Sequence, residues 1–481
     1  MNIYLTWTNK KKFSNIIFRG EEVILSKKVD RKIIKILQSK VEKDSSFWDF
    51  KDDYKKEHIH RIINYPATMV PKMQAEVMNI ILELVENIEN IFDPFMGSGT
   101  ILVEGMLRDL DVYGIDINPL AYLITSVKTK PLEIEHLEIK IKQLFSRIDE
   151  SNLNYEITSF PGINKWFRED IIDDLSKIKN SIMEEKDLYY RRVFWISFCQ
   201  IIRESCNSQH STFKLHVKKE DIINNFKYST INEFKKHILY VKDSMKQFEE
   251  ILGEKLVKKT KVHYRKKVKV INGNSKSIIC DNRRFKKNSI DMIFTSPPYG
   301  DNHTTVTYGQ YSILQLRWID LKDIDSKIDL TIVDKLSEID KRSLGGIYYS
   351  CKEIDESKVL LKSNTLKRIY NKLIEENEIS KARKVASFYI DFNDTLVNCF
   401  RILKPDKYAV FTIGNRRVNN EIIEFNKIIT ELAVYSNATL IYDFSRNILK
   451  KTIPEKVSRL KNNEPVKSMK EENILIFRKN T

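Results

Sequence analysis

Hydrophobic and polar residues alternate with a period that changes along this chain of 481 residues. Apolar side chains recur at helical intervals over residues 73–89, and the short apolar stretch 91–92 predicts a strand that runs into a glycine-containing turn. Residues 101–107 suit a helix packed on a sheet, and residues 112–115 predict a second strand. This order of strand, turn, helix and strand indicates the start of a doubly wound α/β domain.

Two long stretches interrupt this pattern. Residues 131–260 and 320–387 are mostly charged and show helical periodicity. The first stretch carries a seam with steps of three and four residues, formed by Ile231, Phe234, Ile238, Val241, Met245, Phe248 and Leu252. Because this seam spans about three heptads, it favours a bundle helix packed against the main domain over a coiled coil.

Apolar runs typical of strands return after each interruption. Residues 268–271 and 290–294 follow the first, and residues 408–413 follow the second. Residues 438–444 and 473–477 predict an antiparallel pair of strands. The expected fold class is therefore α/β, a doubly wound Rossmann-like sheet with terminal antiparallel strands and two mainly helical insertions.

These patterns divide the chain into six predicted segments. An N-terminal segment without a clear pattern comes first, and two insertions then separate three parts of one α/β core. The predicted bounds are 1–56 for the N-terminal segment, 57–130, 266–319 and 388–481 for the core, and 131–265 and 320–387 for the insertions.

Composition narrows the class of protein. Hydrophobic residues make up 42% of the chain, which excludes a wholly disordered protein. No apolar run reaches the roughly 18 residues needed to span a membrane, and the first residues lack the apolar core of a secretory signal. The five cysteines are scattered and contain no CxxC pair, so they predict reduced thiols. We expect a cytoplasmic protein with no membrane partner.

The chain is strongly basic. Lys and Arg outnumber Asp and Glu by 82 to 66, which gives a formal net charge of +16. Such a charge suggests a polyanionic partner, most simply nucleic acid. The general richness of the chain in lysine, isoleucine and asparagine is an alternative origin of the same charge.

The first candidate motif is Asp93-Pro94-Phe95-Met96-Gly97-Ser98-Gly99-Thr100, between a predicted strand and a predicted helix. Its glycines allow a tight turn that a ligand can approach closely. Asp116 ends the next predicted strand, where its carboxylate could accept hydrogen bonds from a ribose. Leu102 stands where a dinucleotide-binding GxGxxG motif has its last glycine, and no Walker pattern is present. The pattern therefore favours a nucleoside without a pyrophosphate over a turn that only closes a loop.

The second candidate motif is Thr295-Ser296-Pro297-Pro298-Tyr299-Gly300-Asp301, directly after a predicted strand. Two prolines stiffen this loop while their carbonyl groups stay free to accept hydrogen bonds. Ser296 adds a further acceptor and Tyr299 a flat face, which together suit a planar ring with an exocyclic amino group. The alternative is a rigid turn with a packing tyrosine.

These motifs resemble motifs I and IV of the S-adenosylmethionine-dependent DNA amino-methyltransferases. The segments HRIINYPATMVPKM (60–73), GIDINP (114–119) and NGNS (272–275) are similar to motifs X, II and III of that family, although the family usually has an acidic residue where Asn274 stands. The resemblance implies a catalytic set of Ser296, Pro297, Pro298 and Tyr299 and no metal. It implies cofactor contacts from Tyr65, Pro66, Asp93, Pro94, Phe95, Gly97, Gly99, Thr100, Asp116, Ile117 and Asn274.

The Ser-Pro-Pro-Tyr form resembles the cytosine-N4 branch of the family, because the adenine-N6 branch more often has Asp or Asn in place of the serine. The resemblance thus implies methylation of a flipped-out cytosine in double-stranded DNA, within a restriction–modification system whose endonuclease acts separately. Adenine-N6 methylation, RNA amino-methylation and a non-catalytic DNA-binding subunit stay open as alternatives. Cytosine-C5 chemistry is disfavoured, because no proline precedes a cysteine.

Three further features concern the surroundings of these motifs. Either insertion could read the DNA sequence. His58 and His60 form an H-x-H pair that has too few neighbours for a metal site, so we expect solvent-exposed histidines. Arg416 and Arg417 follow a predicted strand and suit a DNA contact and a surface turn equally well.

Overall fold

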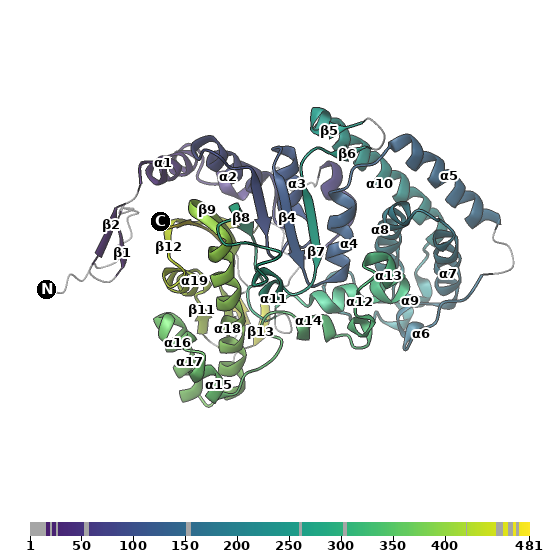
Figure 1. The fold of residues 1–481 in the computed structure, drawn as a ribbon. Coiled ribbons are helices and arrows are strands. Elements are labelled where there is room, and N and C mark those ends of the chain that lie inside the picture. Colours follow the sequence, from purple (N-terminus) through teal and green to yellow (C-terminus); the bar gives the residue numbers. More distant parts are fainter. Residues whose placement is uncertain are drawn as a thin grey trace.

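The structure is a computed structural model, and its sheet and helices are shown in Figure 1. It describes residues 16–19, 22–25, 27–51, 57–150, 155–258, 262–301, 305–419, 421–448, 456–459, 465–467 and 471–481. Within these ranges, no helix combines the length and the apolar character that a membrane span requires.

A seven-stranded sheet forms the centre of the fold, in the order β12-β15-β9-β8-β3-β4-β7. The strands β7, β4, β3, β8 and β9 are parallel neighbours, and β15 runs antiparallel to both β9 and β12. Their bounds are β3 (Asn90–Asp93), β4 (Asp111–Asp116), β7 (Val268–Asn272), β8 (Ile290–Thr295), β9 (Leu403–Ile413), β12 (Ala438–Asn447) and β15 (Glu471–Lys479). The predicted strands and the antiparallel pair are confirmed, and the sheet is the expected doubly wound α/β type.

Two hydrophobic cores lie on opposite faces of this sheet, because successive side chains of a strand point to opposite sides. Ile91 of β3 and Val410 of β9 belong to one core, whereas their neighbours Phe92 and Phe411 belong to the other. The first core is covered by α1 (Lys28–Lys43), α2 (Pro71–Leu84), α3 (Thr100–Leu107) and α4 (Pro119–Lys128). The second is covered by α11 (Ser275–Ile279), α18 (Ile379–Ile402) and α19 (Phe425–Val434).

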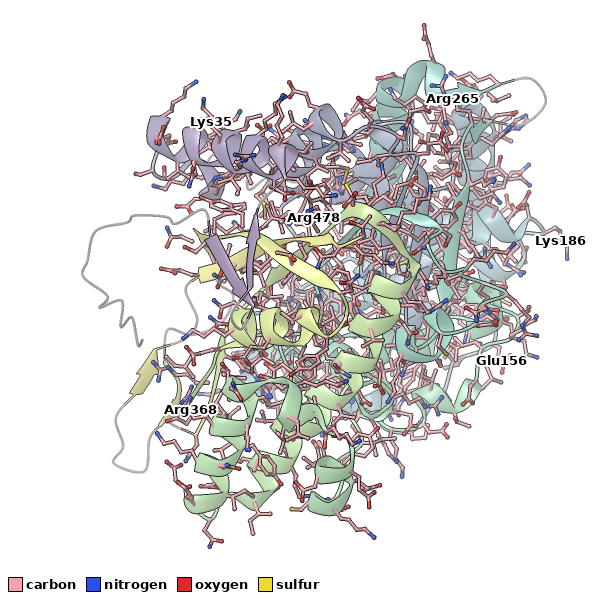
Figure 2. All side chains as sticks on the ribbon, turned by 60° about the vertical axis from the view of Figure 1, so that its left-hand side comes forward. Lys35, Glu156, Lys186, Arg265, Arg368 and Arg478 are labelled. Carbon is pink, nitrogen blue, oxygen red and sulfur yellow. The ribbon has the colours of Figure 1, made fainter. Side chains whose placement is uncertain are left out.

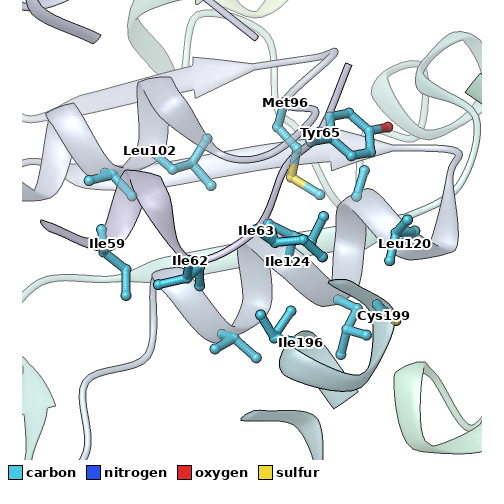
Figure 3. Packing of buried hydrophobic residues seen from close by; sticks show 14 of the residues in the cluster. Ile59, Ile62, Ile63, Tyr65, Met96, Leu102, Leu120, Ile124, Ile196 and Cys199 are labelled. Atoms are coloured by element: carbon cyan, nitrogen blue, oxygen red, sulfur yellow. The ribbon is translucent and has the colours of Figure 1, made fainter. Parts of the chain in front are cut away.

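The first insertion is a helical bundle at the β7 side of the sheet (Figure 1). It contains α5 (Ile134–Glu150), α6 (Ile163–Trp166), α7 (Glu169–Met183), α8 (Leu188–Ser205), α9 (Glu220–Asn225) and α10 (Thr230–Leu252). The seam of α10 faces α5, α7 and α8, and all its members from Phe234 to Leu252 are buried, so the predicted bundle helix is confirmed. Figure 3 shows how residues 59–63, in and after η2 (His58–Arg61), pack between this bundle and the core helices α3 and α4.

Two groups of short helices span the second predicted insertion, and the first group begins before the predicted bound of 320, at Tyr308. The group next to the first insertion comprises α12 (Tyr308–Trp318), α13 (Leu321–Ile324), η4 (Leu330–Val333) and α14 (Glu338–Arg342). The other group packs on α18 at the opposite flank of the molecule and comprises α15 (Cys351–Glu356), α16 (Val359–Lys362) and α17 (Asn364–Glu375) (Figure 1). The segment 343–350 connects the two groups.

The N-terminal segment holds more structure than its pattern indicated. Helix α1 and η1 (Phe47–Asp49) pack against the core, and Asp30 of α1 is fully buried. The Asp30 carboxylate accepts hydrogen bonds from Arg478 of β15, at 3.0 Å, and from the hydroxyl group of Tyr408 in β9, at 2.7 Å. Figure 2 shows Arg478 inside the molecule, unlike the outward-pointing Lys35 and Arg265. A buried charge needs such a partner. Because both partners of Asp30 lie far along the chain, the pattern of the helix alone did not reveal that α1 belongs to the core.

The remaining elements are small. In the described part of the chain, the elements not yet named are four two-stranded antiparallel sheets and one further turn of 3-10 helix. They are β1 (Ile16–Arg19) with β2 (Glu22–Leu25), β5 (Leu256–Val257) with β6 (His263–Tyr264), β10 (Arg416–Val418) with β11 (Glu421–Ile423), β13 (Lys456–Arg459) with β14 (Pro465–Lys467), and η3 (Gly253–Lys255).

Candidate active site

Both motif loops leave the sheet at the place where its strand order reverses. From β3 the chain continues to β4 and β7 on one side, and β8 and β9 then occupy the other side. Such a reversal at the carboxyl ends of parallel strands is where open α/β sheets bind ligands. The two loops are joined directly, because the hydroxyl group of Thr295 at the end of β8 donates a 2.6 Å hydrogen bond to Asp93 at the end of β3.

The glycines of the first loop are required by its backbone. Gly97 and Gly99 have φ angles of +47° and +78°, in the left-handed region that other residues rarely adopt. A Cβ atom on Gly99 would also lie 2.8 Å from the hydroxyl oxygen of Thr125 in α4. The same hydroxyl group donates to the carbonyl of Gly97 at 2.9 Å, so α4 holds the loop in its tight turn.

A cavity of about 820 Å³ opens beside this loop. The expected site residues on its wall are Tyr65, Pro66, Phe95, Gly97, Thr100, Asp116, Ile117, Asn274, Ser296 and Pro298. The wall also includes Ala67, Thr68, Met69, Met96, Ser98, Asn118, Ser275, Tyr308, Ile339, Ser343 and Leu344.

Asp116 places a carboxylate on the cavity wall at the end of β4. One oxygen accepts from the backbone N–H of Gly97 at 2.9 Å and the other from that of Asn118 at 2.8 Å. Burial raises the pKa of Asp116 to about 6, although these hydrogen bonds act in the opposite direction. The carboxylate therefore fixes the glycine turn and also presents a hydrogen-bond acceptor to the cavity.

Aromatic rings form another part of the wall. Tyr65 stacks on Tyr308 of α12 with ring centroids 5.9 Å apart. The hydroxyl group of Tyr65 accepts a 3.0 Å hydrogen bond from Asn118, whose amide also donates to Ser312 of α12 at 2.7 Å. Helix α12, just before the second predicted insertion, thus contributes to the wall of the cavity.

Asn274 connects the cavity to the segment after α14. Its side-chain oxygen caps α11 by accepting from the N–H of Lys276 at 2.9 Å, and its amide donates to the carbonyl of Arg342 at 3.1 Å. Ser343 and Leu344, which follow directly, line the cavity. An aspartate at position 274 could make the cap but not the second bond, because a carboxylate has no donor.

The second loop is held by its tyrosine. The hydroxyl group of Tyr299 donates to Glu472 of β15 at 3.0 Å and lies 3.5 Å from the hydroxyl oxygen of Ser296. Glu472 also pairs with Arg446 of β12 at 2.7 Å. Burial and the Glu472 carboxylate raise the pKa of Tyr299 well above its usual value. The tyrosine is therefore neutral, and its ring orientation depends on the two C-terminal strands of the sheet.

Several expected site residues do not line this cavity. These residues are Asp93, Pro94, Gly99, Pro297 and Tyr299. Asp93 is completely buried, and burial raises its pKa to about 7. The carbonyl of Pro94 accepts a hydrogen bond from Ser275, which ties the first loop to α11.

The residues that sequence reasoning missed come mainly from outside the two motifs. Asn118 lies two positions after Asp116, within the segment already singled out, and the sequence did contain that signal. Tyr308 lies near the end of the predicted core segment 266–319, and Ile339, Ser343 and Leu344 lie in the second insertion. Nothing in their local pattern shows that they line the cavity at the sheet edge.

Two expectations about charged residues are corrected by the structure. His60 is not solvent-exposed but 2% exposed, and its Nε2 lies 2.9 Å from the Glu104 carboxylate of α3. Arg416 is not on a free surface turn, because its guanidinium packs against Gly300 and pairs with the buried Asp301 at 3.3 Å. Among the described residues, no group of three or more His, Cys, Asp or Glu side chains could hold a metal ion.

Comparisons with known proteins identify the family of the chain. The family model of N6 and N4 methyltransferases, described as DNA methylase, matches residues 2–126. The Type II methyltransferase M.MvaI of Kocuria varians is 33% identical over 445 residues, which cover 89% of this chain and 92% of that protein.

Two more distant relatives have similar descriptions. The Type II methyltransferase M.MjaII of Methanocaldococcus jannaschii is 20% identical, with 72% of this chain and 79% of that protein covered. The Type II methyltransferase M.BsoBI of Geobacillus stearothermophilus is 23% identical, with 79% and 78% covered. Because M.MvaI of Kocuria varians is 33% identical over most of both chains, this chain belongs to the family of DNA amino-methyltransferases, whose methyl donor is S-adenosylmethionine.

Proposed function

We propose that this chain methylates the exocyclic N4 amine of a cytosine that is flipped out of double-stranded DNA. The observation that supports this most directly is the position of Ser296, which lies on the wall of the same cavity as the glycine loop and Asp116. A methyl donor and an amino acceptor would thus meet in one cavity. The serine, where the adenine branch more often has Asp or Asn, favours cytosine.

The cavity fits S-adenosylmethionine by the chemistry of its wall. Asp116 would accept hydrogen bonds from the ribose hydroxyls, and Tyr65 and Tyr308 offer flat apolar surfaces. The glycine loop, next to Ser296, would shape the methionine end of the site. When bound, S-adenosylmethionine supplies an electrophilic methyl group on its sulfonium centre.

Ser296 and Pro297 would prepare the amine for this methyl group. The lone pair of an aromatic amine is delocalised into the ring, so the nitrogen is a poor nucleophile. Acceptors on both N–H bonds, the Ser296 hydroxyl oxygen and the Pro297 carbonyl, would pull the nitrogen towards a tetrahedral geometry. The remaining task is orientation, which can contribute about 7–11 kcal/mol.

Tyr299 would hold the extruded base. Flipping costs a few kcal/mol, and stacking on an aromatic ring returns about 1–3 kcal/mol per base. The hydrogen bond from Tyr299 to Glu472 fixes the ring before the base arrives, which limits the entropy lost on binding. A cognate endonuclease acting as a separate protein is part of the same proposal, since the relatives are Type II methyltransferases.

The base can be identified by nucleoside mass spectrometry. DNA lacking amino-methylation is incubated with the purified protein and S-adenosylmethionine carrying a deuterated methyl group, then digested to nucleosides. Labelled N4-methylcytosine is the expected product. Labelled N6-methyladenine would overturn the choice of base and leave the family unchanged.

Two variants test the assignment of Ser296 and Tyr299. Ser296→Ala and Tyr299→Ala should abolish methyl transfer, while S-adenosylmethionine binding measured by calorimetry persists. Ser277→Ala on the surface of α11 and Tyr435→Ala, whose ring is 59% exposed, are the matched controls and should keep normal turnover. Normal turnover in the first two variants would remove the two residues from the proposed base pocket.

A further inference from the structure

An isoleucine is exposed three residues after Leu344, which lines the cavity. Ile347 lies in the segment between α14 and α15 and is 63% exposed, close to the 65% of Leu361 on α16. Single exposed apolar residues are common on protein surfaces, so exposure alone carries no conclusion. A fixed backbone and basic neighbouring residues distinguish Ile347 from other exposed apolar residues.

The backbone on both sides of Ile347 is fixed to the core. Gly345, at a φ of +69°, donates its N–H to Asp391 of α18 at 2.9 Å, and a Cβ there would lie 2.8 Å from the backbone of Phe388. On the other side, the N–H of Tyr349 donates to Ser387 of α18 at 2.9 Å. Ile347 therefore projects from a rigid segment. We call this segment, residues 343–350, the bridge.

This bridge lies close to the active site at two points, the cavity wall and the second motif. Ser343 and Leu344, at its beginning, line the cavity that contains Ser296. Tyr348, just after Ile347, lies close enough to Asp301 and Arg416 for both charges to act on its phenol group. Asp301 belongs to the same motif as Ser296 and Tyr299, so Ile347 lies between a residue of the cavity wall and a residue close to the second motif.

Positive side chains lie close to the segment that carries Ile347. The ammonium group of Lys384 lies 5.2 Å from the centre of the Tyr348 ring, and Arg383 donates to the carbonyl of Tyr349 at 2.8 Å. Lys341 at the end of α14 is exposed, as is Arg417 next to Arg416. Such residues suit contact with the phosphates on either side of an entering base.

We propose that Ile347 is a wedge that enters the base stack of the DNA and fills the gap left by the flipped base. The inference rests on the proposed function, since it requires a base to leave the duplex. Apolar side chains inserted between base steps are known to unstack DNA, and an isoleucine on a rigid support suits this task. The bridge of the second insertion is then the part of the chain that opens the duplex.

The wedge can be tested with two duplexes that contain the methylated site, once it has been mapped by sequencing the product DNA. In one duplex the target base is paired, and in the other it faces an abasic position, so that little energy is needed to flip it. We expect Ile347→Ala to lower kcat about tenfold or more on the paired duplex and less than about threefold on the abasic one. Ile347→Leu should keep most of the activity on both.

Leu361→Ala is the matched control, because Leu361 is equally exposed and lies on α16, outside the cavity wall. It should change neither rate. Equal losses of Ile347→Ala on the two duplexes, or no loss on the paired one, would overturn the wedge. The identity of the methylated base tests the proposed function separately, because the comparison between paired and abasic duplexes applies to an adenine target as well.

Discussion

The side chain of Tyr299 is fixed at both ends, by the proline-rich loop at its backbone and by Glu472 at its hydroxyl group. Glu472 is itself held by Arg446, whose Nε donates to the carbonyl of Trp48 at 3.2 Å. The orientation of a ring in the second motif thus depends on residues distant in sequence. None of these partners could be identified from the sequence, since each is an ordinary charged or aromatic residue without a motif.

A double-mutant cycle tests this coupling. Tyr299→Phe and Glu472→Gln should each lower kcat several-fold with little change in KM for S-adenosylmethionine, because the first removes this hydrogen bond and the second removes the negative charge of its acceptor. Their combination should be no worse than the more severe single variant, which corresponds to a coupling of about 1 kcal/mol. Strictly additive losses would show that the two side chains act independently, and Glu471→Gln, an exposed neighbour, is the control.

Asp93 predicts a pH dependence of stability. Its pKa is raised by burial to about 7, above the value of about 3.9 in an unfolded chain. Folding therefore favours the protonated form, and the contribution of Asp93 to the free energy of unfolding decreases as the pH rises from about 4 to about 7.

Asp93→Asn should remove this term while keeping an oxygen for Thr295. Relative to the wild type, the free energy of unfolding of the variant should increase by more than about 1 kcal/mol between pH 5 and pH 8. Denaturant titrations at the two pH values measure this difference. A constant difference, equal to that of the exposed Asp221→Asn, would show that Asp93 is ionised throughout.

At the scale of elements, the hydrophobic periodicity predicted where individual helices and strands lie in the sequence but not which elements they contact. The seam of α10 and the strands before both motif loops are where the hydrophobic pattern placed them. The pattern could not show that β15 enters between β9 and β12, because an apolar strand does not encode its neighbours. For the same reason it could not show that the segment 339–344 forms part of the cavity wall.

The seam of α10 gives a prediction at this scale. Ile238 is completely buried against the bundle, whereas its neighbour Leu239 is 42% exposed. Ile238→Ala should lower the free energy of unfolding by about 2–5 kcal/mol, and Leu239→Ala should change it by less than about 0.5 kcal/mol. Equal effects in thermal or urea unfolding would contradict the orientation of this helix.

At the scale of the whole molecule, the net charge of +16 acts on DNA binding. Basic side chains such as Lys35, Lys186, Arg265 and Arg368 project from different sides of the protein, so part of this charge lies away from the active site (Figure 2). Lys384 and Arg383 lie close to Tyr348 and Tyr349, next to the proposed wedge Ile347.

DNA affinity should therefore fall steeply with salt. Each phosphate contact contributes a slope of about −0.9 to the plot of log K against log salt concentration. Replacing Lys341 and Lys384 with glutamine should reduce the slope by about 2, while Lys35→Gln and Lys186→Gln should leave it unchanged. Fluorescence anisotropy at several salt concentrations measures the slopes, and an equal reduction by both pairs would place the DNA elsewhere.

The position of β15 has a consequence for the synthesis of the protein. A ribosome makes β9 and β12 before the strand that belongs between them. Until residues 471–479 emerge, each of the two earlier strands has an unpaired edge, and Tyr299 lacks its partner Glu472. A nascent chain interrupted before this point cannot complete the sheet or fix the tyrosine, and its open edges favour aggregation. The same strand that closes the sheet thus makes DNA modification dependent on translation through residue 479.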